Sequence, residues 1–376
     1  MKIAITGTHG IPNRYGGFEA FAEKLSGMLV LLGHEVLVYT PDTHPWQGSR
    51  YNGVELIRIP FHKKGLGTAA TLAYDRLCFS DVLCRKPDII LNCGTPGALF
   101  IQKKYFPPVI TLADGLEWQR RKWNIAGKTV LRITEKKAVT RSAALVTDHP
   151  EMTKYFKNRY GIHSVYIPYG TDIPEQIMPV EAFKKTVASF PTLKGIPSGN
   201  YFLSIARFEP ENNIAMIAEG FLDSRVNARL IIVGNSSNRY GKKLKKRFGS
   251  CPSIRFPGGI YDVQLLNALR YYSAGYIHGH SVGGTNPSLL EAMAAGCLIA
   301  AHDNPFNRYI LGDKAPYFSS SHEVAVIISA WNHKYLPEKE SLTGHYITRL
   351  RQNYNWEHIT DAYLALFKRI LGSENA

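Results

Sequence analysis

The chain has 376 residues, of which 45% are hydrophobic and 20% are charged. This balance excludes a mainly disordered or fibrous protein, and the length suits two domains of about 150–200 residues each. The 45 Lys and Arg residues outnumber the 30 Asp and Glu residues, and the net charge of +15 favours anionic partners such as nucleotides, phospholipid headgroups or polyprenyl phosphates. No signal peptide and no membrane-spanning stretch is expected, which predicts a cytoplasmic protein.

The first half of the chain alternates short apolar strands with helices. It begins with a predicted strand at 2–6, a glycine-rich loop at 7–17 and an amphipathic helix at 18–32. Further strands are predicted at 35–40, 54–59, 88–93, 109–112 and 144–147. Such alternation predicts a parallel sheet that is covered by helices on both faces.

The pattern pauses at 173–198, where we predict a linker, and then restarts. The second half is predicted to have strands at 201–206, 229–233, 254–256, 274–278 and 297–301, and helices at 213–222, 263–272, 287–295 and 357–371. We therefore expect two Rossmann-like doubly wound domains facing a central cleft, over 1–172 and 199–355. The segment 356–376 is expected to form a C-terminal helix that packs back on the first domain. Ligands of such sheets bind at the carboxyl ends of the strands.

Gly16 and Gly17 open the first predicted helix, directly after the glycine-rich loop. Main-chain N–H groups and the helix dipole can face an anion at such a position. The spacing does not match the G-x-G-x-x-G fingerprint of dinucleotide-binding sites. A purely structural turn is the alternative interpretation.

Arg207 directly follows the predicted strand that opens the second domain. A guanidinium at the end of a strand is well placed to bind a diphosphate, although a structural ion pair would use the same residue. Further along, the sequence Gly283-Gly284-Thr285-Asn286-Pro287 precedes a helix, with Asn286 as the expected N-cap and Pro287 in the first turn. Glu291, one turn into this helix, could accept hydrogen bonds from ligand hydroxyls or could be an ordinary surface carboxylate.

Asp114 follows a predicted strand of the first domain and stands beside a glycine and Trp118. A carboxylate in this position could orient or deprotonate a sugar hydroxyl. The alternative is that Asp114 caps a following helix.

Two other functions remain open from the residues alone. The segment Gly279-His-Ser281-Val-Gly283 matches the G-x-S-x-G elbow of α/β-hydrolases, and it is followed by His302, Asp303, His322 and His345. Against a hydrolase, the next helix is predicted to start well after Ser281, and the whole first domain would have no role. A basic nucleic-acid-binding protein is the other alternative, but neither a helix-turn-helix nor an aromatic strand motif supports it.

Basic residues gather in several clusters, and the first 170 residues carry most of the net positive charge. Each cluster could be a solvated face, whereas several together favour a membrane surface or a polyprenyl-phosphate site. The clusters are Lys63-Lys64, Lys103-Lys104, Arg120-Arg121-Lys122, Lys136-Lys137 and Lys242-Lys243-Leu244-Lys245-Lys246-Arg247.

Together these motifs resemble the GT-B fold, family 4 glycosyltransferases, over nearly the whole chain. The matching segments are Gly16-Gly17, Gly33-His-Glu-Val36, Ile167-Pro-Tyr-Gly-Thr-Asp172, Arg207 with Glu211-Asn212, and Gly283 with Glu291. The more specific segments at 10–19, 114–118 and 283–293 resemble bacterial polysaccharide β-1,4-rhamnosyltransferases. Two positions depart from the family pattern, because Asn212 replaces a lysine and Gly283 replaces a glutamate.

The resemblance implies a hexosyltransferase. This enzyme would transfer rhamnose from dTDP-rhamnose to a polyprenyl-diphosphate-linked saccharide, with retention of the configuration at the anomeric carbon. It implies catalytic roles for Arg207 on the diphosphate and Asp114 at the reacting groups. No bound metal or cofactor is expected, and the protein would be peripheral on the inner face of the cell membrane. The implied donor-binding residues are Gly16, Gly17, Arg207, His280, Gly284, Thr285, Asn286 and Glu291, and the implied acceptor-binding residues are Asp114, Glu117, Trp118 and Arg120.

Overall fold

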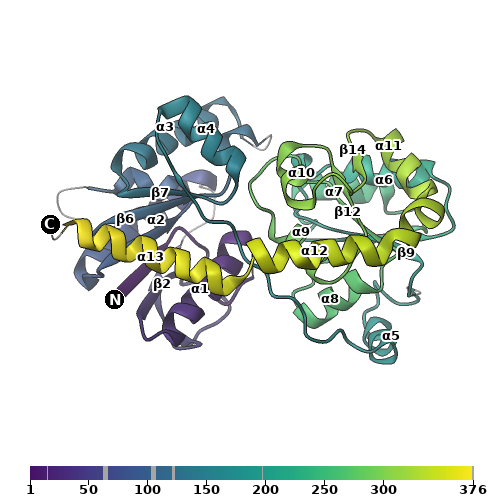
Figure 1. The fold of residues 1–376 in the computed structure, drawn as a ribbon, viewed down its shortest axis with the longest axis horizontal. Helices are drawn as coiled ribbons and strands as arrows, with labels where there is room; N and C mark the ends of the chain where they lie inside the picture. Colours follow the sequence, from purple (N-terminus) through teal and green to yellow (C-terminus); the bar gives the residue numbers. More distant parts are fainter. Residues whose placement is uncertain (15, 62–66, 103–106, 121–122, 197, 375–376) are drawn as a thin grey trace. The chain divides into compact units, whose positions relative to one another are not determined.

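The computed structural model describes the chain except residues 15, 62–66, 103–106, 121–122, 197 and 375–376. The basic clusters Lys63-Lys64, Lys103-Lys104 and Arg121-Lys122 therefore lie outside the described residues. The chain divides into two compact units, which are Met1–Gly170 with Trp356–Ala376 and Thr171–Asn355 (Figure 1). Among the described residues, no helix combines the length and the apolar character that a bilayer crossing requires.

Unit 1, which is Met1–Gly170 with Trp356–Ala376, contains an eight-stranded sheet in the order β3-β4-β2-β1-β5-β6-β7-β8. All neighbouring strands are parallel except the pair of β3 and β4. The strands are β1 (Lys2–Thr6), β2 (Glu35–Pro41), β3 (Arg50–Tyr51), β4 (Val54–Ile59), β5 (Ile89–Cys93), β6 (Val109–Ala113), β7 (Ala144–Thr147) and β8 (Val165–Tyr166). The helices are α1 (Gly17–Leu31), α2 (Gly67–Arg85), α3 (Ile125–Arg141), α4 (Pro150–Tyr160) and α13 (Trp356–Glu374), with short helical turns η1 (Pro96–Phe100) and η2 (Glu117–Gln119).

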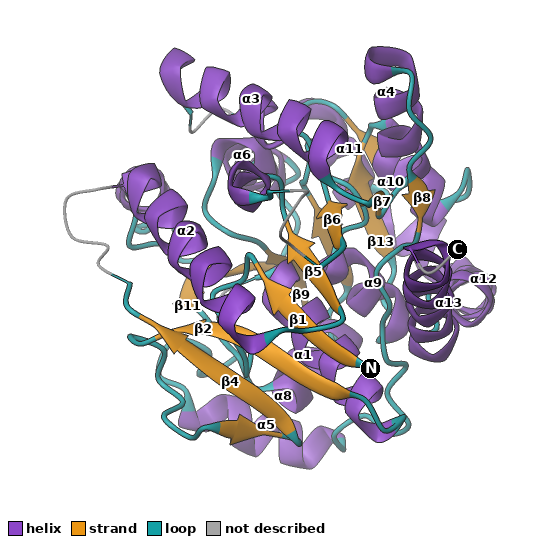
Figure 2. Cartoon of the chain, turned by 90° about the vertical axis from the view of Figure 1, so that its left-hand side faces the viewer, coloured by secondary structure: helices purple, strands orange, loops and turns teal. Residues whose placement is uncertain are grey.

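The C-terminal helix α13 is part of unit 1 because its aromatic residues pack against α1. The Phe21 ring lies 5.5 Å from the Tyr363 ring and 6.2 Å from the Trp356 ring, and the Thr360 hydroxyl donates to the Met28 sulfur at 3.4 Å. Helix α2 covers the sheet from the opposite face (Figure 2). Both faces of the sheet are therefore covered, which explains why its central strands β1 and β5 are mainly apolar.

Unit 2, which is Thr171–Asn355, contains a six-stranded parallel sheet in the order β11-β10-β9-β12-β13-β14. The strands are β9 (Tyr201–Ile205), β10 (Arg229–Val233), β11 (Ile254–Gly258), β12 (Gly275–His278), β13 (Ile299–His302) and β14 (Tyr317–Phe318). The helices are α5 (Val180–Ser189), α6 (Ile214–Asp223), α7 (Arg239–Phe248), α8 (Val263–Tyr271), α9 (Pro287–Ala294), α10 (Pro305–Leu311), α11 (Ser321–Ser329) and α12 (Lys339–Asn353), with turns η3 (Pro210–Asn212), η4 (Trp331–Tyr335) and η5 (Leu336–Glu338). The predicted pair of Rossmann-like parallel-sheet domains is confirmed.

Five helices of unit 2, which are α5, α7, α10, α11 and α12, were absent from the sequence prediction. Helix α5 lies within the stretch 173–198, for which we expected a linker, and its Phe183 is buried and stacks on Tyr272 at 4.7 Å. Helix α7 buries only Gly241, Leu244 and Phe248. Both helices bury only two or three of their residues, so the contacts that hold them come from distant parts of the chain.

The glycines provide a matched pair of stability tests in unit 1. Gly7 has a φ of +77°, and a Cβ there would lie 2.1 Å from the main-chain oxygen of Cys93. Gly27 lies within α1, where a Cβ would meet nothing within 4 Å. We expect Gly7→Ala to lower the free energy of unfolding by about 1–3 kcal/mol, and Gly27→Ala to raise it by about 0.5–1 kcal/mol.

Urea unfolding of both variants measures these changes. A Gly7→Ala protein as stable as the wild type would contradict the close approach of the first loop to the end of β5.

Candidate functional site

Each sheet has one point at which the strand order reverses. In unit 1 the order reverses between β1 and β5, and in unit 2 between β9 and β12. The carboxyl ends of the strands at such a point form the usual ligand site of an open α/β sheet. The predicted loop at 7–17 follows β1, and the segments that begin at Arg207 and Gly279 follow β9 and β12.

In unit 2, hydrogen bonds join the two segments at the reversal point. The Asn213 side-chain amide donates to the main-chain oxygen of Gly279 at 2.8 Å. The Ser281 N–H and hydroxyl both donate to the main-chain oxygen of Glu211, at 3.0 and 2.8 Å. A Cβ on Gly279 would lie 2.2 Å from the main-chain oxygen of Asn212, so this close approach requires glycine. We call these contacts the β9–β12 clasp.

Arg207 is exposed and directly precedes the clasp. Its main-chain oxygen accepts hydrogen bonds from the Asn212 side chain at 2.7 Å and from the Glu209 N–H at 2.8 Å. Within the described part of the chain, its guanidinium forms no ion pair, so the structural ion pair considered above is not supported. The buried Asn212, at the position of the family lysine, holds the loop that presents Arg207.

Helix α9 begins as the sequence predicts, with Pro287 in the first turn and Asn286 as the N-cap. The Asn286 side-chain oxygen accepts the Ser288 N–H at 3.0 Å and the Ser288 hydroxyl at 2.8 Å. Gly283 has a φ of +142°, a conformation that strains any residue with a side chain. The backbone therefore explains why glycine, and not the family glutamate, stands at 283.

Glu291 on α9 forms an ion pair with Arg270 on α8, a residue that the sequence analysis did not identify. The Arg270 side chain is 2% exposed and the Glu291 side chain is 42% exposed. The other end of the guanidinium donates to Asn267 at 3.2 Å. Among the described residues only Oε2 of Glu291 is engaged, so Oε1 can accept a hydrogen bond from a ligand.

His280 follows β12, and its ring stacks on that of His278 with a centroid distance of 4.4 Å. The Asn304 and Asn307 side chains donate to the His280 main-chain oxygen at 3.1 and 3.0 Å. His278 is buried, and this burial lowers its pKa to about 3, with a smaller contribution from His302. The neutral ring of His278 therefore packs against the ring of His280, and the role of His280 in donor binding stays a prediction.

The arrangement around Ser281 does not support the hydrolase interpretation. Its hydroxyl donates to a main-chain oxygen of the clasp and not to a histidine. The Asp303 carboxylate accepts two hydrogen bonds from the Arg308 guanidinium, at 2.5 and 2.8 Å. Helix α9 starts at Pro287, whereas a hydrolase helix would start at the serine.

In unit 1, carboxylates of α1 hold the glycine-rich loop. Glu19 accepts the His9 N–H at 2.8 Å and Glu23 accepts the Asn13 N–H at 2.6 Å. As predicted, the helix begins at Gly17, after an extended Gly16. These bonds fix the loop beside the β1–β5 reversal point.

Asp114 directly follows β6, and its Oδ2 accepts the hydroxyl of the buried Tyr169 at 3.2 Å. The next helical turn is preceded by Leu116, so Asp114 does not cap it. Burial raises the pKa of the Cys93 thiol, and the charges of Glu19 and Asp114 raise it further. Both carboxylates therefore lie near the end of β5.

The other predicted acceptor residues interact with one another or with the core. Arg120 and Glu117 form an ion pair at 2.6 Å, and the Trp118 indole N–H donates to Glu135 at 3.1 Å. Glu135 is buried, and it also accepts the hydroxyls of Tyr155 and Tyr160 at 2.7 and 2.6 Å. Sequence analysis missed Glu135 because its partners lie far along the chain.

Among the described residues, no group of three or more His, Cys, Asp or Glu side chains is placed to hold a metal ion. Metal independence stays a prediction.

Comparison with known proteins assigns a family to part of each unit. Residues 193–326 match the model of the family "Glycosyl transferases group 1", and residues 101–172 match a domain of unknown function, DUF1972. No curated protein matches the chain. The second unit is thus a group 1 glycosyltransferase domain, and the chain is a glycosyltransferase enzyme.

Solved structures share the fold at low sequence identity. A sucrose-phosphate synthase from Thermosynechococcus elongatus has a TM-score of 0.78 at 16% identity, covering 99% of each chain. Anabaena HepE, in complex with UDP and glucose, has a TM-score of 0.76 at 15% identity, covering 98% of this chain and 100% of its own. A glycosyltransferase from Rickettsia africae has a TM-score of 0.70 at 14% identity, covering 98% of each chain. These matches show the GT-B fold, and their names give no support to rhamnose in particular.

The ion pair of Arg270 and Glu291 predicts a loss of stability when the carboxylate is removed. Glu291→Ala leaves a buried guanidinium without its anion, and we expect the free energy of unfolding to fall by about 1–3 kcal/mol. The loss stays below that of a fully buried pair because water reaches Glu291. Glu291→Gln keeps an oxygen acceptor and should lose less. Urea unfolding of both variants measures the difference, and an unchanged Glu291→Ala midpoint would disprove a structural role for the pair.

The buried His278 predicts a pH-dependent stability. Its pKa is about 3 in the folded protein, against an ordinary 6.5, so the unfolded state binds the proton more readily. The contribution of His278 therefore falls as the pH drops below about 6.5, with a slope of up to about 1.4 kcal/mol per pH unit. Comparing urea unfolding of the wild type and His278→Phe from pH 7 to pH 5 isolates this slope. His322→Gln, at an exposed site on α11, is the control, and parallel curves for wild type and His278→Phe would refute the assignment.

Proposed function

We propose that this glycosyltransferase transfers a hexose from a nucleoside diphosphate sugar, with dTDP-rhamnose as the donor, to a lipid-linked saccharide acceptor. The observation that carries the proposal is the exposed Arg207 guanidinium, which has no ion-pair partner among the described residues. It stands where the β9–β12 clasp joins two loops at the reversal point of unit 2. An uncompensated cation at this point suits a diphosphate.

Glycosyl transfer of this kind depends on stabilising the charges that develop in the transition state, and it depends less on a protein nucleophile. Cleavage of the bond between sugar and phosphate builds positive charge on the ring and negative charge on the departing diphosphate. Arg207 and the main-chain N–H groups of Gly284 and Thr285, before α9, are proposed to bind that diphosphate. Oε1 of Glu291 would accept a hydrogen bond from a ribose hydroxyl, and His280 or Asn286 would contact the sugar.

The choice of sugar rests on Gly283 and on the resemblance of segments 10–19, 114–118 and 283–293 to rhamnosyltransferases. A glycine at 283 removes the carboxylate that binds sugar hydroxyls in the wider family. This loss is consistent with a 6-deoxyhexose, which has one hydroxyl fewer than glucose. UDP-glucose is the competing donor, since UDP and glucose are bound by HepE.

Unit 1 is proposed to supply the acceptor contacts, through Asp114, Glu117, Trp118 and Arg120. Gly16 and Gly17 would bind the donor diphosphate through their N–H groups. We propose retention, with the departing phosphate taking the acceptor proton; in an inverting reaction Asp114 would be the base. The positive charge of unit 1 supports peripheral binding to an anionic membrane surface, where a polyprenyl-linked acceptor for surface polysaccharide resides.

A thermal-shift panel of dTDP-, UDP- and GDP-sugars tests this function. A donor that binds only the folded state raises the melting temperature, and we expect dTDP-rhamnose to give the largest shift. Arg207→Ala should abolish the shift and lower kcat/KM by about 100-fold or more, since a donor to the developing charge is removed.

Arg351→Ala removes an arginine of α12 that is also exposed, and it is the matched control. Wild-type activity in Arg207→Ala would reject the proposed role of Arg207. A complete loss of activity in Ser281→Ala, with Arg207→Ala active, would instead support the hydrolase. A larger shift with UDP-glucose would reject the choice of sugar while leaving glycosyl transfer in place.

A further inference from the structure

Helix α3 of unit 1 leaves apolar side chains in contact with solvent. Ile125 is 86% exposed, Ile133 is 47% exposed and Val130 is 36% exposed. The inner face of the helix carries its buried residues, which are Leu131, Thr134, Glu135 and Ala138. Ile125 and Ile133 are about two turns apart and point away from this inner face. Packing within unit 1 therefore does not account for these two isoleucines.

The polar groups between these isoleucines are satisfied inside the helix. Five exposed residues follow one another at helical spacing, and we call them the outer stripe of α3: Ile125, Thr129, Ile133, Lys136 and Thr140. The hydroxyls of Thr129 and Thr140 donate to main-chain oxygens one turn earlier, at 3.0 Å each. Because both hydroxyls have partners within the helix, moving the outer stripe out of water leaves neither of them unpaired.

The exposed charges of α3 are all positive. Glu135 is the only acidic residue of the helix, and its carboxylate is buried and accepts three side-chain hydrogen bonds. The cations on or beside the outer stripe are exposed or half-buried, and they are Lys128, Arg132, Lys136 and Lys137. None of these four forms an ion pair within the described part of the chain. Cations beside exposed apolar residues on one helix are typical of a surface that binds anionic lipid headgroups.

Unit 1 holds α3 in place at both ends. The Asn124 side chain caps the first turn by accepting the Gly127 N–H at 2.9 Å. In the last turn Arg141 donates to the main-chain oxygens of Leu99 and Ile101, at 2.9 and 3.1 Å. Helices α2 and α3 both contact η1, and they lie on the side of the sheet opposite α1 (Figure 2). The outer stripe is therefore a fixed surface on that side of unit 1.

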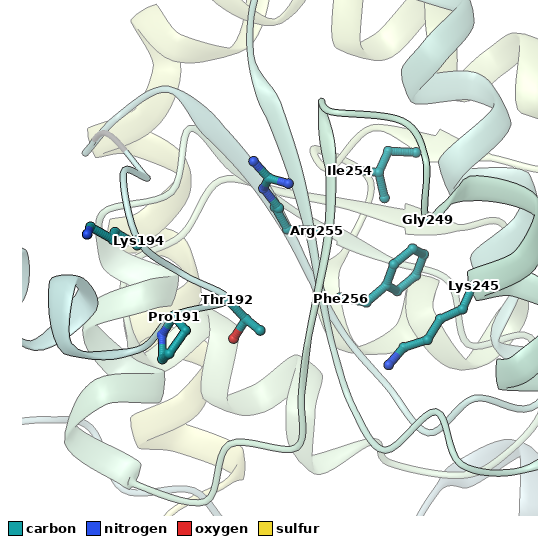
Figure 3. A pocket seen from close by; sticks show the side chains of 8 residues that line it. All are labelled: Pro191, Thr192, Lys194, Lys245, Gly249, Ile254, Arg255 and Phe256. Carbon is teal, nitrogen blue, oxygen red and sulfur yellow. The ribbon is translucent and has the colours of Figure 1, made fainter.

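The cavity beside β11 of unit 2 is a contrasting case, in which cations do not form one surface. Lys194, Lys245 and Arg255 line this cavity of about 620 Å³, but their charged ends point apart (Figure 3). Arg255 also lies on the opposite face of β11 from Ile254 and Phe256, because side chains alternate along a strand. In α3 the apolar and basic side chains share one outward face, so a single partner can contact both.

We propose that the outer stripe of α3 binds the surface of an anionic phospholipid bilayer. Ile125 and Ile133 enter the boundary between headgroups and acyl chains, while Lys136 and Lys137 contact lipid phosphates. A nucleic acid would engage the cations but offers no apolar layer to the isoleucines, so the bilayer fits better. Docking through α3 deepens the proposed function, on which it rests, by naming the surface that meets the membrane.

Trp118 connects this surface to the proposed acceptor site. The Arg132 guanidinium lies 4.4 Å from the centre of the Trp118 ring, and Trp118 is one of the proposed acceptor residues. A bilayer bound at α3 therefore lies beside the segment that would receive a lipid-linked saccharide.

Vesicle sedimentation of the full chain tests the apolar contacts. The vesicles are phosphatidylcholine with and without phosphatidylglycerol, and no sugar donor or acceptor is added. Ile125→Ser/Ile133→Ser should weaken binding about ten-fold or more, since serine lacks the apolar area that the bilayer removes from water. The matched control is Leu31→Ser/Leu32→Ser, because these leucines are 87% and 54% exposed at the end of α1, on the other side of the sheet. This control should stay within about two-fold of the wild type.

The same assay tests the charges. Lys136→Gln/Lys137→Gln should weaken binding about ten-fold or more, because each lysine close to an anionic surface adds to the attraction. Lys368→Gln/Arg369→Gln removes the same charge from exposed positions of α13. It should stay within about three-fold of the wild type, since charges far from the bilayer are screened at physiological salt. Urea unfolding of all four variants should give a midpoint close to that of the wild type.

We expect the wild type to bind vesicles that contain phosphatidylglycerol and not phosphatidylcholine alone. Equal binding to both vesicles, binding to neither, or an equal loss in stripe and control variants would overturn the proposal. A loss confined to the lysine variant would also overturn it, and a matching loss of binding to a DNA duplex would identify a nucleic-acid surface instead. The thermal-shift panel of sugar donors reports separately on the proposed function, so failure of either test leaves the other result standing.

Discussion

The candidate site depends on the β9–β12 clasp, in which two loops that are far apart in sequence bind each other through two main-chain oxygens. Ser281 donates twice to Glu211, and Asn213 donates to Gly279. Because the clasp uses backbone groups and the half-buried side chains of Asn213 and Ser281, it holds the loops without using Arg207. The guanidinium therefore remains exposed while the backbone beneath it is fixed, as expected for a group that is preorganised for a charged ligand.

Cations in this protein follow two different patterns. Arg270 is buried and its charge is balanced by Glu291, so this ion pair joins α8 to α9. Arg207 is exposed, and it forms no ion pair within the described residues. Since an unbalanced charge is costly only when it is buried, Arg207 can stay without an acidic partner at little cost. This contrast distinguishes a cation that stabilises the fold from one that is accessible to an anion.

Much of the fold could be predicted because local patterns indicate it. The strands around Ile3, Ile90 and Ile231 are continuous apolar runs, and Asn286-Pro287 is a strong signal for a helix start. Helices α5 and α7 were missed because their buried faces are narrow. Glu135 and Arg270 were missed for a related reason: the three donors to Glu135 lie 17 to 25 residues away, and Glu291 lies 21 residues from Arg270.

By itself, the sequence determined the alternation of strands and helices, the position of the glycine-rich turns and the residue types available for binding a diphosphate. These features depend on neighbours along the chain, through hydrophobic periodicity, capping and allowed backbone angles. Only the tertiary structure decided that Ser281 bonds to the backbone, that Glu291 shares its carboxylate with a buried arginine, and that Glu135 accepts three side-chain hydrogen bonds. Each of these outcomes depends on which strands become neighbours in the sheet, a contact between distant residues that no local pattern contains.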